Sequence, residues 1–192
     1  RGAGPAGLRG MLPRTPITDY RLIEPFERRA SAEPYAGHLC IIRPLLDIPR
    51  ADIERYCAEH DLAPRFDRSN LDTTYFRNRL RHELLPLLED YNPNIRTRLC
   101  HTAAVIAADY ALLTRLRDQA WADVVREEQP NAIVFDLAAW RALSVSLQRA
   151  VLREAVYRLR RNLRDVDFVH VEDARRVGLQ GQTGAQATLP GG

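Results

Sequence analysis

The chain has 192 residues, of which 45% are hydrophobic and 28% are charged, and its formal net charge is +3. This composition is typical of a globular protein and argues against a disordered or fibrous chain. The sequence contains no apolar run of the roughly 20 residues that a membrane-spanning helix needs, and no signal peptide is visible. We therefore expect a cytoplasmic protein with no membrane partner, built as one large domain or two small ones.

All 28 basic residues are arginine, which indicates a general compositional bias, so only the placement of an arginine is informative. The three cysteines, Cys40, Cys57 and Cys100, form neither a Cys-x-x-Cys pair nor a Cys/His pattern with metal-ligand spacing. We expect three reduced thiols and no metal site. Because the chain begins with Arg1 rather than methionine, we also expect it to be a piece of a longer protein.

The first half of the chain has the pattern of an α/β domain. Residues 39–42 form a short apolar run before Arg43 and Pro44, which is typical of a buried strand that ends at a proline. Pro49 suits the first turn of a helix that ends near His60. A strand followed by a helix predicts the last unit of a parallel sheet, whose ligands bind beyond the carboxyl ends of the strands. Arg43 is then either near that binding edge or simply a solvated strand end.

Residues 67–88 carry the most informative pattern. Asp67 and Asn70 lie in a segment that we expect to be a loop, because their side chains hydrogen-bond nearby backbone and resist helix interiors. Residues 77–88 predict a helix with three leucines on one face, and Arg79, His82 and Glu83 pointing away from it. The leucines are Leu80, Leu84 and Leu87.

Arg77 and Arg81 lie one turn apart at the edge of the leucine face, and two interpretations of them stay open. In one, they lay their methylene groups over the core and keep their guanidinium groups in water. In the other, they are partly desolvated beside buried leucines and converge with Asn78 on a phosphate or carboxylate in a cleft.

The second half of the chain has the pattern of an all-α domain. Its apolar spacing predicts helices over residues 94–127, 144–163 and 169–177. Residues 133–135 suit a small strand or a staple, and residues 178–192 suit a loop or frayed tail. We place the domain boundary between residues 92 and 93.

One strong charge pattern lies in this helical half. Seven arginines and a single acid, Glu154, occur between Arg141 and Arg164. A basic stripe with Tyr157 inside it is typical of a surface that binds RNA phosphates. It is equally typical of a solvated face whose last arginines complement the helix dipole. The stripe residues are Arg149, Arg153, Tyr157, Arg160 and Arg164.

Several segments together resemble the tRNA(Ile)-lysidine synthase family, which belongs to the PP-loop ATP pyrophosphatases. They are the glycine-rich start at residues 1–11, Ile-Ile-Arg-Pro-Leu-Leu at 41–46, Asp-x-Ser-Asn at 67–70 and Arg-Asn-x-x-Arg at 77–81. The order and spacing of these elements carry the resemblance. It implies the C-terminal end of a parallel-sheet, Rossmann-like PP-loop domain, followed by a mainly helical domain that binds tRNA.

The resemblance also implies a two-step ligase reaction. ATP adenylates the C2 oxygen of the first anticodon cytidine of tRNA(Ile) with a CAU anticodon, and pyrophosphate leaves. The side-chain amine of free L-lysine then attacks C2 and expels AMP, which gives lysidine. ATP and Mg²⁺ are the implied cofactors, both bound mainly by residues upstream of this chain. A homodimer stays open.

The family motifs assign roles to residues of this chain. The implied catalytic residues are Arg77, Asn78 and Arg81, and Asp67 and Asn70 support them. The implied rim of the ATP and lysine pocket consists of Arg1, Gly2, Gly4 and Arg43. Ala3 replaces a serine of the family turn, so no hydroxyl acts there.

The family's Ser-Gly-Gly-x-Asp-Ser ATP loop does not occur in this sequence, and we expect it upstream. We therefore expect the chain alone to be inactive. Two other functions stay open: another PP-loop tRNA modifier, such as a thiolase, and a non-catalytic helical module that binds RNA.

Overall fold

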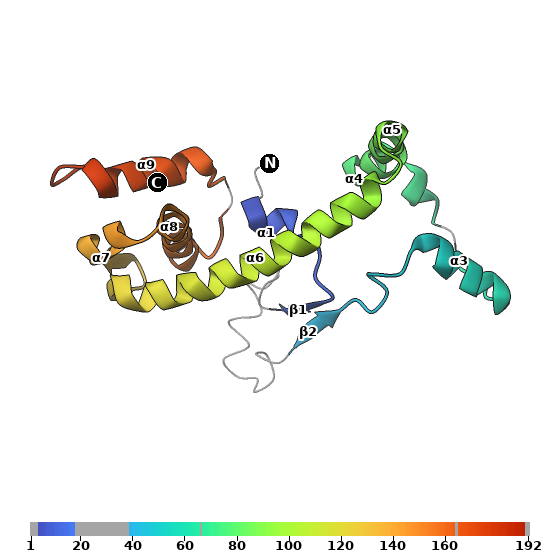
Figure 1. Ribbon diagram of the computed structural model, residues 1–192, viewed down its shortest axis with the longest axis horizontal. Helices are drawn as coiled ribbons and strands as arrows, with labels where there is room; N and C mark the ends of the chain where they lie inside the picture. The colour runs from blue at the N-terminus through green and yellow to red at the C-terminus, as the bar shows by residue number, and fades with distance from the viewer. Residues whose placement is uncertain (1–3, 18–38, 66, 164, 191–192) are drawn as a thin grey trace. The chain divides into compact units, whose positions relative to one another are not determined.

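The computed structural model describes residues 4–17, 39–65, 67–163 and 165–190 (Figure 1). It consists of two compact units: unit 1 combines Arg1–Arg9 with Val105–Gly192, and unit 2 is Gly10–Ala104. None of the described helices is both long enough and apolar enough to cross a membrane.

The strands of unit 2 are short and antiparallel. In β1 (Arg14–Pro16) and β2 (Cys40–Ile42), Arg14 pairs with Ile42. The predicted strand position is confirmed, but its predicted burial is wrong, since Ile42 is 69% exposed. Among the described residues β2 pairs with β1 alone, and its other two residues, Cys40 and Ile41, are half-buried. A continuous apolar run does not distinguish such a strand from one inside a parallel sheet.

The predicted helices of unit 2 are present with one irregularity. Helix α3 (Arg50–Glu59) follows Pro49 and ends at His60, as expected. The 3₁₀ turn η3 (Arg68–Leu71) precedes three consecutive helical segments that cover the predicted helix over 77–88. They are α4 (Phe76–Arg79), the π-helical turn η4 (Leu80–Leu84) and α5 (Leu85–Tyr91).

Pro86 explains the π-helical turn. A proline inside an α-helix removes a hydrogen bond and its ring clashes with the carbonyl group four residues earlier, here that of His82. In the wider turn, the Leu85 N–H donates to the carbonyl oxygen of Leu80 instead. The helix therefore continues past the proline.

Unit 1 contains the C-terminal part of α6 (Ile95–Val124) and a hairpin of β3 (Val125–Gln129) and β4 (Ala132–Phe135). The predicted helix over 94–127 is thus confirmed except for residue 94 and for its last three residues, which belong to β3. Of the two structures considered for residues 133–135, a small strand or a staple, the strand is confirmed.

Three helices complete unit 1. The short α7 (Leu137–Ala142) was not expected, whereas α8 (Val145–Arg160) and α9 (Phe168–Gln180) correspond to the predicted helices over 144–163 and 169–177. Helix α1 (Gly4–Leu8) also belongs to unit 1.

The core of unit 1 lies where α6, α7 and α8 meet the hairpin. Trp121 contacts Phe135 edge to face, with ring centroids 5.9 Å apart. In the same cluster Val151 is fully buried and Trp140 is 2% exposed. The buried members of this cluster are Ala120, Trp121, Val124, Trp140, Val151 and Ala155. This core fixes the position of α8, whose arginines matter below.

Gly178 of α9 lies against Trp140 of α7, and its substitution tests how close this contact is. A Cβ atom at this position would lie 2.7 Å from Cζ3 of the buried Trp140. Alanine favours a helix over glycine by about 1 kcal/mol, but overpacking costs about 1–3 kcal/mol. We therefore expect Gly178→Ala to lower the thermal unfolding midpoint. In a Trp140→Leu background, which removes the clashing atoms, the same change should raise the midpoint relative to that background. A higher midpoint in the otherwise unchanged protein would refute the close contact.

The ionisation of Asp136 should make the stability of the folded protein depend on pH. Its carboxylate caps α7 by accepting from the N–H groups of Ala138 (2.9 Å) and Ala139 (3.0 Å), and it pairs with Arg126 at 2.6 Å. The bond from Ala139, followed by that from Arg126, lowers the pKa of Asp136. Its stabilising effect is therefore complete above the ordinary carboxyl pKa and disappears as the pH falls through the lowered pKa. Unfolding midpoints measured from pH 7 downwards should show a smaller acid dependence in Asp136→Asn, and an unchanged dependence would contradict this assignment.

Candidate functional site

The loop predicted at Asp67–Asn70 is a pair of tight turns closed by two carboxylates. The Asp67 carboxylate accepts a hydrogen bond from the Ser69 N–H at 2.9 Å, and this bond lowers the pKa of Asp67. The Asp72 carboxylate accepts from the Thr74 hydroxyl (2.6 Å) and N–H (2.9 Å), which lowers the pKa of Asp72. Both side chains are therefore ionised near neutral pH and hold the turns.

Asn78 fastens these turns to the helix that follows. It is 8% exposed, and its Nδ2 donates to the carbonyl oxygens of Ser69 and Asp72, each at 2.8 Å. These bonds use both N–H groups of the side chain. Asn78 therefore positions the loop–helix site, by which we mean residues 67–83.

His82 makes a second link between loop and helix. Its Nε2 lies 2.9 Å from the carbonyl oxygen of Asn70. Since a carbonyl oxygen only accepts, the proton of this bond belongs to Nε2. Asn70 thus contributes its backbone carbonyl to the loop–helix site, while Asp67 contributes its side chain.

Arg77 and Arg81 are exposed, and neither has a hydrogen-bond or ion-pair partner among the described residues. Of the two interpretations of these arginines, desolvation beside buried leucines is therefore wrong for this structure. Two of the three leucines are open to solvent: Leu84 is 42% exposed and Leu87 is 51% exposed. The two arginines are consequently free to meet an anion.

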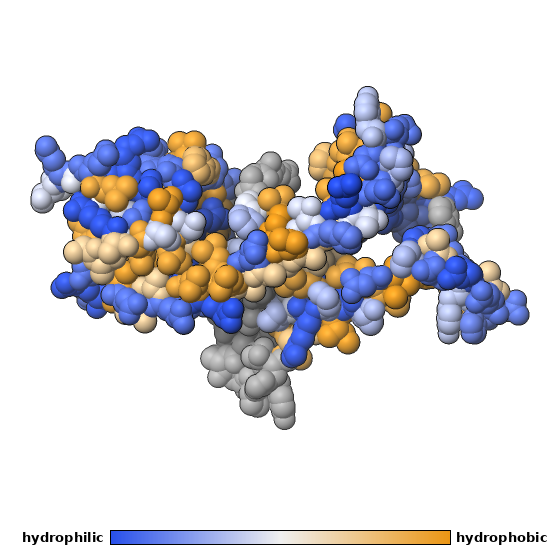
Figure 2. All heavy atoms as spheres, viewed as in Figure 1, coloured by the Kyte–Doolittle hydropathy of each residue, from blue (hydrophilic) through white to orange (hydrophobic). Residues whose placement is uncertain are grey.

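The leucine face forms an open apolar hollow of about 400 Å³. Figure 2 shows hydrophobic side chains among charged ones at the surface along α4 and α5. Arg79 and Glu83, expected to point away from this face, instead line the hollow, because the helical spacing of residues 76, 79, 80, 83, 84 and 87 forms one continuous band.

The residues expected at the pocket rim are only partly described. The Arg43 guanidinium donates to the Leu12 carbonyl at 2.9 Å and to the Thr15 hydroxyl at 3.1 Å, so it ties β2 to the chain around β1. Gly4 begins α1 with a left-handed φ of 56° and belongs to unit 1. Arg1 and Gly2 lie outside the described residues. That Arg1, Gly2, Gly4 and Arg43 line one pocket rim stays a prediction.

The arginines of α8 do not form a uniform stripe. Arg149 pairs with Glu172 at 2.6 Å, which raises the pKa of Arg149 and neutralises its charge, and it also lies over the ring of Phe168. In Arg160 the Nη1 group is buried and has no partner among the described residues. Arg153 is half-buried with no partner in the same part of the chain, and Arg164 lies outside it.

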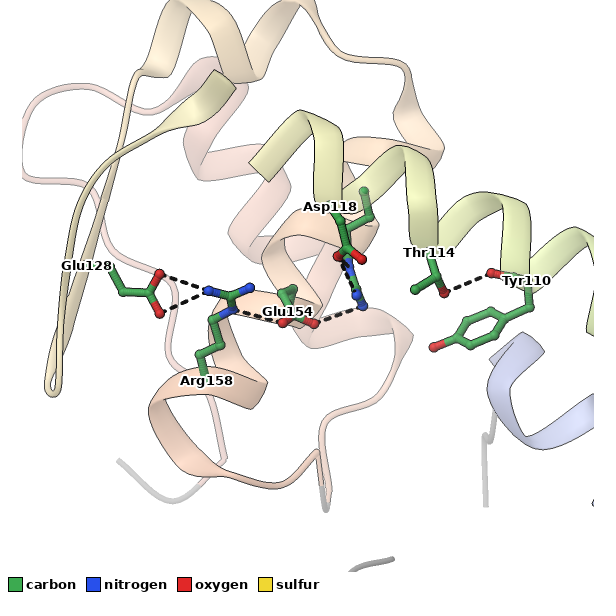
Figure 3. Close-up of polar contacts among 7 residues, drawn as sticks. Tyr110, Thr114, Asp118, Glu128, Glu154 and Arg158 are labelled. Carbon is green, nitrogen blue, oxygen red and sulfur yellow. Dashed lines mark hydrogen bonds and ion pairs between the residues drawn. The ribbon is translucent and has the colours of Figure 1, made fainter. Parts of the chain in front are cut away.

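Arg158 is the centre of an ion network that the sequence did not reveal (Figure 3). It pairs with Glu154 at 2.9 Å and with Glu128 at 2.9 Å. Its guanidinium also lies 4.1 Å from the ring centroid of Trp121. Glu154 also pairs with Arg117 at 2.9 Å. The acids Glu128 and Glu172 come from the hairpin and from α9, so counting charges along α8 alone misses them.

The structure shows no metal-binding cluster of His, Cys, Asp or Glu in the described ranges. Cys40, Cys57 and Cys100 form no disulfide, and Sγ of Cys40 accepts a hydrogen bond from Nε of Arg14 at 3.3 Å.

Comparison with known proteins gives two family matches in chain order. Residues 1–88 match the PP-loop domain, and residues 135–192 match the TilS substrate binding domain. The chain therefore consists of a PP-loop part followed by a helical part.

The chain is similar to several proteins named tRNA(Ile)-lysidine synthase. The one from Dehalococcoides mccartyi (strain CBDB1) is 34% identical over 90% of this chain and 34% of its own length. The one from Geobacter sulfurreducens is 35% identical over 78% of this chain and 32% of its own length. The one from Thermosynechococcus vestitus is 30% identical over 100% of this chain and 49% of its own length.

This chain thus spans about a third to a half of the length of these relatives. Both family matches and the relatives agree: over most of its length the chain is similar to tRNA(Ile)-lysidine synthases.

Proposed function

We propose that this chain is part of an enzyme that ligates lysine to C2 of the first anticodon cytidine of tRNA(Ile), with ATP as the activating substrate. The observation that carries the proposal is the succession of a PP-loop match and a TilS substrate-binding match in one chain. The names of its relatives support the same reaction.

The finer fold assignment also belongs to this proposal. The PP-loop match supports a parallel, Rossmann-like sheet for the domain that includes residues 1–92. A helical domain over residues 93–192 is supported by the start of α6 at Ile95 and by the second match, which begins at residue 135. The antiparallel β1–β2 pair would then be an edge of the PP-loop domain.

The proposed contribution of the loop–helix site is electrostatic. Arg77 and Arg81 are exposed cations one turn apart on a helix that Asn78 and His82 fix to the loop. Such groups stabilise negative charge that shifts between phosphate oxygens, or hold the carboxylate of free lysine, without having to reorganise. Because the N–H groups of Asn78 are used, we assign it a positioning role.

The described residues contain no group of three or more His, Cys, Asp or Glu side chains that could hold a metal ion, so none of them is assigned to Mg²⁺. The family analogy gives Mg²⁺ and most ATP contacts to other residues of the protein, and the part played here is that of the two arginines.

A second candidate function is a helical module that binds RNA without catalysing a reaction. The exposure of Arg77 and Arg81 favours it, because exposed arginines serve RNA phosphates as readily as a nucleotide in a pocket. Both candidates predict RNA binding, and they differ in what these two arginines do.

Substitution of these arginines separates the two functions. In the full-length protein we expect Arg77→Ala and Arg81→Ala each to reduce lysidine formation about 100-fold or more, as loss of one preorganised donor does. The tRNA dissociation constant should change less than about 2-fold, because a single phosphate contact contributes little to it. Lysidine formation is followed by mass spectrometry of the tRNA, and binding by filter retention.

Arg50→Ala is the matched control, since Arg50 lies on α3 of the same unit and forms only an exposed ion pair with Glu54 at 2.7 Å. It should keep nearly full activity. If Arg77→Ala and Arg81→Ala weaken tRNA binding as much as they slow turnover, the two arginines bind RNA and their assignment to the reaction is wrong.

Substitution of Arg153 tests whether α8 is part of the surface that binds tRNA. We expect Arg153→Glu to weaken tRNA binding and to reduce the slope of log affinity against log salt by about 1 for each phosphate that is no longer bound. Arg176→Glu makes the same charge change at a site on α9 that is 69% exposed and already paired with Asp173, so it serves as the control. Equal losses in both variants would mean that only the net charge matters.

A further inference from the structure

The arginines along α8 divide into two groups by their partners. Arg149 and Arg158 each have a carboxylate partner and each lie over an aromatic ring, so their charges are already used within unit 1. Arg160 has neither kind of partner in the described ranges, but its Nη1 group is buried. Arg153 and Arg161 have neither kind of partner among the described residues and are the two unused cations considered below.

Tyr157 lies midway between these two unused cations. It is 41% exposed, and its hydroxyl has no hydrogen-bond partner among the described residues. No described ring or guanidinium group stacks on it, in contrast to Trp121 and Phe168, which Arg158 and Arg149 cover. The structure thus leaves one aromatic ring of this helix without a covering partner in the described ranges.

Helical spacing places Arg153 and Tyr157 on one face of α8, and Arg161 follows at its end. Positions 153, 157 and 161 follow one another at four-residue intervals, which separates their backbone positions by about 6 Å each along the axis. A cation, a ring and a second cation then alternate over about 12 Å.

The backbone of Arg161 adds an independent observation. Arg161 caps α8 in the left-handed conformation, with φ 57° and ψ 9°. Glycine is the usual residue at such a helix end, and any side chain there costs free energy. The chain keeps an arginine where glycine would be favoured, which suggests that the guanidinium has a use.

We propose that Arg153, Tyr157 and Arg161 bind an unpaired nucleotide of RNA, with its base stacked on Tyr157 and the flanking phosphates on the two arginines. Aromatic rings bracketed by cations are typical of surfaces that bind single strands, because every base has a face to stack. Bases inside a duplex are already stacked on their neighbours and are not available. The proposal rests on the proposed function only in taking RNA as the partner.

The helix dipole explains less of this arrangement than stacking of a base does. Cations at a helix C-terminus are favourable, so the dipole accounts for Arg161. It gives no reason for an exposed, uncovered tyrosine ring, nor for Arg153, which lies two turns before the helix end. Stacking of a base accounts for all three residues.

Two RNA probes and four variants of the full-length protein test the proposal. The probes are a single-stranded oligouridylate of about eight nucleotides and an RNA duplex with the same number of phosphates. We expect Tyr157→Ala and Tyr157→Leu to weaken binding of the single strand roughly 5- to 150-fold, the range for loss of one stacked base. Tyr157→Phe should retain binding, and the affinity for the duplex should change little in all three.

Tyr157→Leu keeps an apolar side chain in the partly buried position, so a folding defect in Tyr157→Ala does not decide the result. Arg161→Gly gives opposite changes in two measurements. It should raise the thermal unfolding midpoint, because glycine suits the left-handed cap, and it should weaken binding of the single strand.

The outcomes distinguish this proposal from the proposed function. If the protein forms lysidine but Tyr157→Leu binds the single strand as well as the unchanged protein, stacking on Tyr157 is refuted and the reaction stands. If single and double strands lose affinity equally, the surface recognises phosphates alone and the proposal is also refuted. If the single-strand effects appear but no lysidine forms, the nucleotide site stands and the reaction must be replaced.

Discussion

The buried amide of Asn78 is the interaction on which the candidate site depends. Its two donated hydrogen bonds join two turns, each closed by a carboxylate, to the first turn of α4. A buried amide without these partners would lose more free energy than a typical hydrogen bond contributes, so loop and helix keep one arrangement. The helix can then present Arg77 and Arg81 to solvent without any partner of their own among the described residues. A site prepared in this way does not have to reorganise when an anion arrives.

In the helical half, neighbouring side chains likewise determine which arginines are available to a ligand. Glu128 and Glu172 reach α8 from the hairpin and from α9 and neutralise Arg158 and Arg149. An ion pair that also stacks on a ring is held more firmly than one in open solvent, so these arginines secure the fold and contribute little charge outside it. The net charge of +3 therefore does not reveal that the unpaired positive charge is confined to a few arginines.

The sequence predicted those features that depend on residues close together in the chain. Apolar spacing located α6, α8 and α9, and the Asp-x-Ser-Asn pattern located a turn, because periodicity and capping are local properties. Partners from distant segments could not be predicted. The antiparallel pairing of β2 with β1, the acids facing α8 and the two carbonyl groups that bind Asn78 are examples. The exposure of Arg77 and Arg81 belongs to this second class, since burial depends on which segment packs over the leucines.

The π-helical turn shows how a local irregularity can serve the site. Pro86 prevents regular α-helical bonding one turn earlier, and the chain responds by widening at Leu80–Leu84 rather than by ending. A widened turn rotates the residues before it relative to those after it. Arg81 and His82 lie inside this segment, so the direction of one cation and the link to Asn70 are set where the helix departs from regular geometry. Turns of this kind are often found at functional positions, which agrees with the assignment of this helix to the site.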